Sequence, residues 1–281
     1  GVFKGPELMY QKVIKPCLAK KQMCFEPLWH VNYVNQSESV YFQSYLSILE
    51  SLTPEQFQIF LSADHSSAIA SVGAMLEYYK DLGVIWIDAH GDLNTKKTSP
   101  TGNLHGMPLS VLLGLEKSFP FIKNYLAPEK LVLIGIRDLD EGEKKIIKDL
   151  NIRYYTPEDI KRQGAKQVIA EAVNYIGDSP KFVSFDIDAM DPEVAPATGT
   201  PVADGLKLHD LKLMSEFIAE QNDFVGCEIV ELNPELANSE FEMAQSLEVI
   251  RSFCEAVLPE NLKTDYEFLR TKSFHSPVLF Q

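Results

Sequence analysis

Residues 84–92 read Val-Ile-Trp-Ile-Asp-Ala-His-Gly-Asp. A short apolar run that ends in carboxylates is typical of a buried strand in a parallel sheet. Residues two apart on a strand share a face, so we expect Asp88 and His90 to point the same way. Residues 181–192 show a second run of this kind, Lys-Phe-Val-Ser-Phe-Asp-Ile-Asp-Ala-Met-Asp-Pro, in which Asp186 and Asp188 form the equivalent pair.

The two strand ends together predict a metal site. Open α/β sheets bind ligands outside the carboxyl ends of their strands. Carboxylates and a histidine that meet there, with no Lys or Arg beside them, repel one another unless a cation balances the charge. Oxygen and nitrogen ligands without thiolates suit Mn, Mg, Fe, Co or Zn, and a carboxylate-rich set favours the harder ions. We therefore expect two ions that share carboxylates.

Some of these acids have a purely structural interpretation. Asp64 could cap a helix that starts at Ser66, and Asp191 precedes a proline in a natural turn. Carboxylates that only cap or turn do not explain why two histidines accompany them. The metal interpretation is the stronger one for the set as a whole.

Strand-like and helix-like patterns alternate along the chain, which predicts a single three-layer αβα domain over residues 1–281, with a mainly parallel sheet. The strand candidates are residues 57–62, 83–88, 130–136, 152–155, 181–187 and 224–230, with 25–28 as a weaker seventh. The helix candidates are residues 66–80, 107–115, 142–149, 157–176, 207–221 and 240–257.

Composition excludes several classes of function. The 281 residues include 26 basic and 40 acidic ones, a net charge of −14, which argues against nucleic acid and anionic membranes as partners. No apolar run approaches the roughly 18 residues of a membrane span, and no signal peptide is visible. The four cysteines are scattered, which favours a reducing compartment. A cytoplasmic protein is the expectation.

Three of the six histidines follow strand candidates or lie in the loops after them: His65, His90 and His105. A single histidine is usually a structural residue. Three of them at corresponding strand ends, two close to aspartates, favour metal ligation or proton transfer.

Several motifs resemble those of the arginase (ureohydrolase) family, in the family's order and over most of the chain. Residues 81–95 resemble its second metal motif, residues 63–66 (Ala-Asp-His-Ser) the first, and residues 184–192 with 195–201 the third. The resemblance implies an arginase/deacetylase-like fold and a hydrolase that holds two Mn²⁺ ions, with Co²⁺ or another divalent ion as a possible substitute. An ion-activated hydroxide would attack a guanidinium carbon and release urea.

The resemblance also implies residue roles. One ion would be held by His65, Asp88, Asp92 and Asp186, and the other by Asp88, His90, Asp186 and Asp188. His105 would be the proton shuttle, and Asp92 would belong to the catalytic group as well as to the ligands. Glu231, in residues 226–234, would pair with the guanidinium, and Thr200 would lie near it.

Two further segments resemble family segments that bind the substrate at the end opposite the guanidinium. Asp140 and Glu143 resemble the family's contacts to an α-amino group, although both also suit an acidic helix start. Asn94, Thr101 and Asn103 resemble its contacts to an α-carboxylate. Together they predict cleavage of L-arginine to L-ornithine and urea, and the resemblance implies a homo-oligomer, a trimer.

The chain also departs from the family pattern. Ser62 and Ala63 replace two usual glycines, and Thr101 replaces a common serine. Residues 1–6 resemble the segment after the family's first strand, so we expect that strand to be missing. Residues 276–281 do not match the family's tail, and we expect residues 262–281 to be a tail of the domain.

Three other functions compete with arginase activity. The nearest is a ureohydrolase for agmatine or another guanidino compound. The second is a non-catalytic, metal-binding relative. A two-metal phosphoesterase is disfavoured because no Lys/Arg cluster is present to bind phosphate oxygens.

Overall fold

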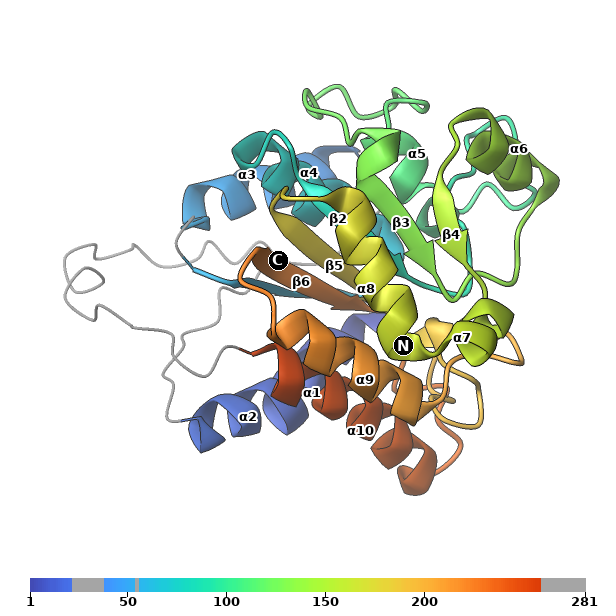
Figure 1. Ribbon diagram of the computed structural model, residues 1–281. Helices are drawn as coiled ribbons and strands as arrows, with labels where there is room; N and C mark the ends of the chain where they lie inside the picture. Colours follow the sequence, from blue (N-terminus) through green and yellow to red (C-terminus); the bar gives the residue numbers. More distant parts are fainter. Residues whose placement is uncertain (22–37, 54–55, 259–281) are drawn as a thin grey trace, which may run out of the picture.

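A computed structural model describes residues 1–21, 38–53 and 56–258. Its centre is a six-stranded parallel sheet with the order β1-β6-β5-β2-β3-β4 (Figure 1). All six main strand predictions are confirmed, whereas the weaker candidate at 25–28 lies outside the described residues. The strands are β1 Gln58–Leu61, β2 Gly83–Ile87, β3 Leu131–Ile134, β4 Arg153–Tyr155, β5 Lys181–Asp186 and β6 Phe224–Val230.

Helices cover both faces of the sheet, which confirms the three-layer αβα architecture (Figure 1). The longer α-helices are α3 Glu38–Ser51, α4 Ala68–Tyr78, α6 Glu141–Asp149, α8 Ala165–Ile176, α9 Leu208–Ala219 and α10 Glu240–Val257. Shorter ones are α1 Gly5–Met9, α2 Lys15–Lys20, α5 Pro108–Leu112 and α7 Pro157–Gln163, with a π-helical turn η2 Tyr10–Ile14 between α1 and α2. None of the helices in these described ranges is long and apolar enough to cross a membrane.

Alternate side chains of β2 enter two different cores. Ile85 and Ile87 pack in the core shared with α8, α9 and α10. Val84 and Trp86 pack on the other face, with α4, α5 and α6. This is the two-residue periodicity of a strand whose faces are both buried. It places the side chain of Asp88, the next residue in the alternation, on the α4 side at the sheet's carboxyl edge.

One helix prediction differs from the structure, and two helical segments were not predicted. The expected helix at 157–176 is two helices, because Gly164 has φ = +92°, which a right-handed helix does not allow. The N-terminal helical segment and α3 were not predicted. In α3, Tyr41, Tyr45 and Ile48 are buried at helical spacing, but Phe42 and Leu46 on the exposed side obscure the pattern.

Gly135, just after β3, brings this strand end close to the backbone of Asp88. Its φ is +94°, and an added Cβ would lie 2.9 Å from the Asp88 carbonyl oxygen. We expect Gly135→Ala to lower the free energy of unfolding by about 1–3 kcal/mol in chemical denaturation, since strain and a backbone clash combine. Gly164→Ala is the matched control, since its φ is similar but no atom lies within 4 Å. Equal losses in the two variants would show that the close approach to Asp88 has no effect.

Candidate metal centre and active site

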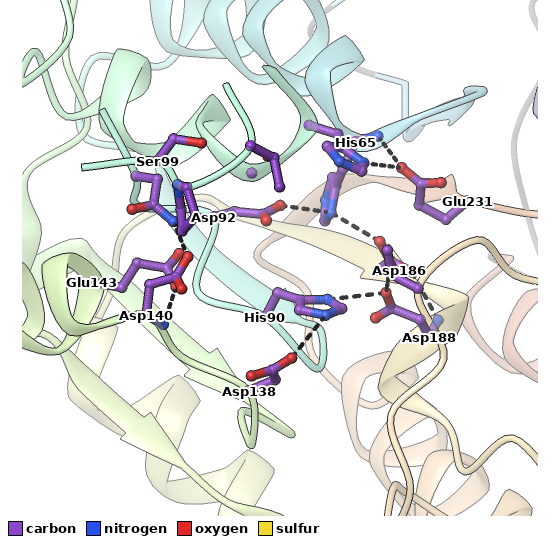
Figure 2. Close-up of a pocket in the computed structure, with 16 residues that line it drawn as sticks. His65, His90, Asp92, Ser99, Asp138, Asp140, Glu143, Asp186, Asp188 and Glu231 are labelled. Carbon is purple, nitrogen blue, oxygen red and sulfur yellow. Dashed lines mark hydrogen bonds and ion pairs between the residues drawn. The ribbon is translucent and has the colours of Figure 1, made fainter. Parts of the chain in front are cut away.

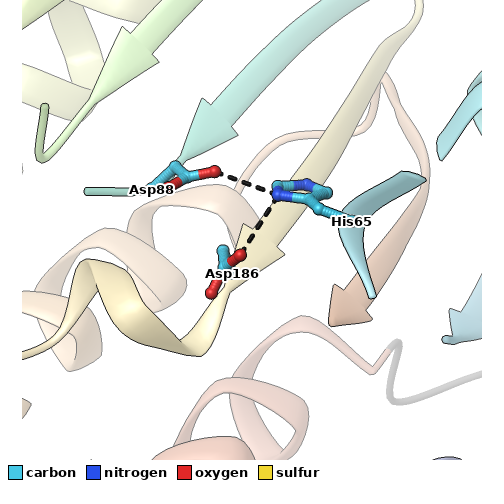
Figure 3. Close-up of side chains that lie close together, drawn as sticks. All are labelled: His65, Asp88 and Asp186. Atoms are coloured by element: carbon cyan, nitrogen blue, oxygen red, sulfur yellow. Dashed lines mark ion pairs between the residues drawn. The ribbon is translucent and has the colours of Figure 1, made fainter. Parts of the chain in front are cut away.

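The carboxyl ends of the neighbouring strands β2 and β5 bring Asp88 and Asp186 together (Figure 3). His65 reaches them from the short helical turn η3 (His65–Ser67) after β1. Its Nδ1 lies 3.0 Å from Asp88 Oδ2, 3.2 Å from Asp186 Oδ2 and 3.1 Å from Asp92 Oδ2. His65, Asp88 and Asp186 form a group whose ligand atoms could hold one metal ion.

A second cluster adjoins the first and shares Asp88. His90 Nδ1 lies 3.1 Å from Asp188 Oδ2 and 3.4 Å from Asp88 Oδ1, and these three residues could hold another ion. Thr200 donates its hydroxyl proton to Asp188 Oδ2 at 2.9 Å, so it acts on this cluster. The structure thus brings together all six residues predicted as ligands.

The donor atoms fit a hard divalent cation. His65 Nδ1 and Asp92 Oδ2 are buried without a hydrogen-bond partner, although they lie 3.1 Å apart. Three carboxylate oxygens surround Nδ1, yet none lies in the direction of an N–H bond. A nitrogen lone pair and carboxylate oxygens that converge in this way are suited to a shared metal ion.

Buried acids crowd the site. Burial and the charges of Asp188 and Asp88 raise the pKa of Asp186 well above its usual range. Burial and Asp88 raise the pKa of Asp92 to about 7. Burial lowers the pKa of His90, but its contacts with Asp188 and Asp88 prevail and raise it to about 12. Protons and metal cations are alternative ways to balance this charge, so the site's electrostatics favour cation binding.

Trp86 supports the first cluster from inside the sheet. Its ring stacks on His65 with centroids 4.0 Å apart and planes 7° apart. Its Nε1 donates to Asp88 Oδ2 at 3.0 Å, while the backbone N–H of His90 donates to Asp88 Oδ1 at 2.7 Å. Asp88 is therefore fixed by two donors that leave it facing both clusters.

Both clusters open into one cavity of about 280 Å³ (Figure 2). Glu231 and His105 lie along its wall, and His105 Nδ1 is 3.8 Å from Glu231 Oε1. This carboxylate raises the pKa of His105, which favours the protonated imidazole. Seven acidic side chains line the cavity and no Lys or Arg does, among the residues the structure describes. The cavity therefore suits a cationic ligand.

Glu231 is held in an uncommon conformation just after β6. Its φ is +66°, its backbone N–H donates to the Ala63 carbonyl at 2.8 Å, and its Oε1 accepts the His65 backbone N–H at 2.8 Å. Asp92 also has a positive φ, +52°. Non-glycine residues rarely adopt this region, and such strain concentrates at functional sites.

Asp140 and Glu143 lie at the other end of the cavity from Glu231 (Figure 2). Asp140 Oδ2 accepts from Asn94 Nδ2 at 2.7 Å. Both oxygens of Glu143 accept backbone N–H groups, from Leu93 at 3.0 Å and from Asp140 at 2.9 Å, so Glu143 also caps α6. The structural and functional interpretations of these acids thus coexist.

The residues predicted to bind an α-carboxylate are only partly gathered there. Asn94 and Thr101 line the cavity, whereas Asn103 is exposed and is not among the lining residues. Ser99 and Asp138 line it as well and were not predicted. The spacing of a loop sequence does not show which of its side chains turn inward.

Two residues behind the site were also missed. Arg137 donates to several backbone carbonyls, including Asp188 at 2.9 Å and Val202 at 2.7 Å, and so ties the loop after β5 to a neighbouring segment. Glu228, interpreted from sequence as an ordinary polar residue, is fully buried. The signal was its place inside the apolar run of β6, an interior strand of the sheet.

The protein has a parallel sheet between two layers of helices, and two adjoining carboxylate–histidine clusters lie at the carboxyl edge of that sheet. These features place it among α/β proteins with a candidate two-ion centre. Comparison with known proteins narrows the class. A model of the arginase family matches residues 16–254. The chain belongs to the arginase family.

Individual relatives agree with this. The arginase of Saccharomyces cerevisiae is 37% identical over 230 residues, which are 78% of this chain and 69% of that protein. The crystal structure of Bacillus subtilis arginase has a TM-score of 0.84 at 32% identity, over 92% of this chain and 93% of that one. The structure of Entamoeba histolytica arginase with L-ornithine has a TM-score of 0.81 at 28% identity, over 92% of each chain.

Proposed function

We propose that this protein is a manganese-dependent arginase, which hydrolyses L-arginine to L-ornithine and urea. The observation that carries the proposal is the position of both carboxylate–histidine clusters in the same cavity as Glu231, with no Lys or Arg among the described lining residues. A guanidinium group is a planar cation, and a carboxylate is the partner that matches both its charge and its shape. Two divalent ions in these clusters would supply Lewis-acid chemistry, which activates water near neutral pH.

The chain's own residues would divide the remaining work. Glu231, anchored through Oε1 by the His65 backbone N–H, would present its carboxylate to the guanidinium and orient it. His105 lies beside Glu231, and therefore beside the guanidinium that Glu231 would bind, so it could protonate the departing amine. Its raised pKa keeps that proton available. A positioned acid of this kind contributes about 10²–10⁴ in rate.

The acidic end of the cavity supports an amino acid substrate. Asp140, together with Glu143, would face an α-ammonium group, while Asn94 and Thr101 would meet the α-carboxylate. The Entamoeba histolytica arginase was crystallised with L-ornithine, which carries both groups. Agmatine lacks the carboxylate, so it would leave Asn94 and Thr101 without a partner. Hydrolysis of agmatine is the nearest alternative function. The predicted homotrimer, the cytoplasmic location and the single domain over residues 1–281, with residues 262–281 as its tail, stay predictions.

Urea release from L-arginine and from agmatine, measured for the wild type and for Asp140→Asn, tests the substrate. We expect L-arginine to be preferred, and the substitution to raise KM for L-arginine about tenfold or more, since a charge-assisted contact of roughly 1.5–3 kcal/mol is lost. Agmatine turnover should change less. Glu141→Gln is the matched control, because Glu141 is a neighbouring acid with an 89% exposed side chain. Faster release from agmatine than from L-arginine would contradict the proposed substrate.

A further inference from the structure

A chain of three polar side chains runs from His65 into the core. His65 Nε2 lies 2.7 Å from Ser184 Oγ, and Ser184 Oγ lies 2.7 Å from Glu228 Oε1. Glu228 Oε2 accepts the hydroxyl of Ser71 on α4 at 2.6 Å. Ser184 and Glu228 are partners in the register of β5 and β6, so the backbone of the sheet fixes their separation.

The direction of the hydrogen bonds follows from the other nitrogen of His65. Nδ1 makes no hydrogen bond, because none of the three nearby carboxylate oxygens lies along an N–H direction. The neutral ring that faces a cation must then carry its proton on Nε2. Ser184 Oγ accepts the hydrogen bond from Nε2–H and donates its own hydrogen to Glu228 Oε1.

Glu228 is an unusual group in this position. It is fully buried, and no Lys or Arg forms an ion pair with it among the residues that the structure places. Both of its oxygens accept serine hydroxyls, the arrangement expected of a carboxylate that lacks a cationic partner. A buried carboxyl group without a cationic partner lowers the stability of the fold, which favours a role beyond packing.

We propose that Glu228 is a positioning residue, which acts through Ser184 to hold His65 with the Nδ1 lone pair directed at the ion of the first cluster. The inference rests on the proposed function only in assuming that this cluster binds a cation. An outer carboxylate that orients a ligating histidine and increases its basicity typically changes metal affinity by 10–100-fold. Trp86 restrains the plane of the ring by stacking, whereas Glu228 and Ser184 determine which nitrogen carries the proton.

The test is the affinity of the purified full chain for Mn²⁺, measured by equilibrium dialysis and metal analysis. We expect Ser184→Ala and Glu228→Gln each to lower the affinity for one of the two Mn²⁺ ions about 10–100-fold. Ser71→Ala is the matched control, because it removes the hydroxyl on the opposite oxygen of Glu228, away from His65. We expect it to leave both affinities within about threefold of the wild type, below the effect of such outer partners.

Unfolding of each metal-free variant separates positioning from general stability. A purely structural network predicts that Ser71→Ala and Ser184→Ala lower stability and metal affinity alike, and equal weakening of Mn²⁺ binding would overturn the proposal. Wild-type affinity in Ser184→Ala would overturn it as well. Failure of the proposed function has a different signature: the wild type would bind two ions and respond to Ser184→Ala, yet release no urea.

Discussion

Asp186→Asn is expected to abolish urea release while the protein stays folded. Asp186 Oδ1 accepts the Asp188 backbone N–H at 2.8 Å, and an asparagine oxygen can retain that bond. The other oxygen faces His65 Nδ1 at 3.2 Å, where an amide would replace a charged ligand. We expect Mn²⁺ affinity to fall by more than about 100-fold, beyond the range of outer-shell changes, and turnover to fall with it.

The unfolding free energy of the metal-free variant provides the internal check. Burial and like charges already raise the pKa of Asp186, so a neutral side chain removes repulsion from the site. Metal-free Asp186→Asn should therefore be at least as stable as the metal-free wild type. Glu141→Gln is the control, since this acid has an 89% exposed side chain and lies outside both clusters. Two tightly bound ions in Asp186→Asn would show that Asp186 is not a ligand.

Glu231→Gln carries the second large effect, and it separates substrate binding from metal binding. The amide oxygen can still accept the His65 backbone N–H, so the local backbone should persist. The charge that would pair with a guanidinium is lost. Removal of one partner from a buried charge pair costs about 2–5 kcal/mol, which corresponds to a decrease in kcat/KM of roughly 30- to 5,000-fold.

Metal analysis and steady-state kinetics with L-arginine measure the two quantities independently. We expect Glu231→Gln to retain both ions. Glu235→Gln is a control four residues away, where the side chain is 53% exposed and pairs with Lys4 and the N-terminal amine. A wild-type kcat/KM in Glu231→Gln would show that Glu231 does not bind the guanidinium.

The sheet could be predicted because its strands are apolar runs interrupted abruptly by acids. In a parallel sheet both faces are buried, so the runs are continuous and their ends are sharp. The helices were harder to predict. Gly164 offered a signal for the break between α7 and α8, but α3 mixes buried Tyr41 with exposed Phe42, so its periodicity is weak.

The candidate ligands could be predicted for the same reason as the strands. Residues two apart at a strand end share a face, and the carboxyl ends of neighbouring parallel strands meet. Contacts that depend on loop conformation were not accessible in this way, and Asn103 and Ser99 are examples. Glu228 was missed because its significance depends on which strand neighbours β6, a matter of sheet order.

Urea release from L-arginine by metal-stripped protein, titrated with Mn²⁺, distinguishes a two-ion arginase from a non-catalytic metal-binding relative. We expect no urea without metal, and activity that rises and saturates near two ions per chain. The number of ions follows from the two clusters that share Asp88. Folded protein that binds two Mn²⁺ ions per chain and releases no urea from L-arginine would contradict the proposed arginase activity.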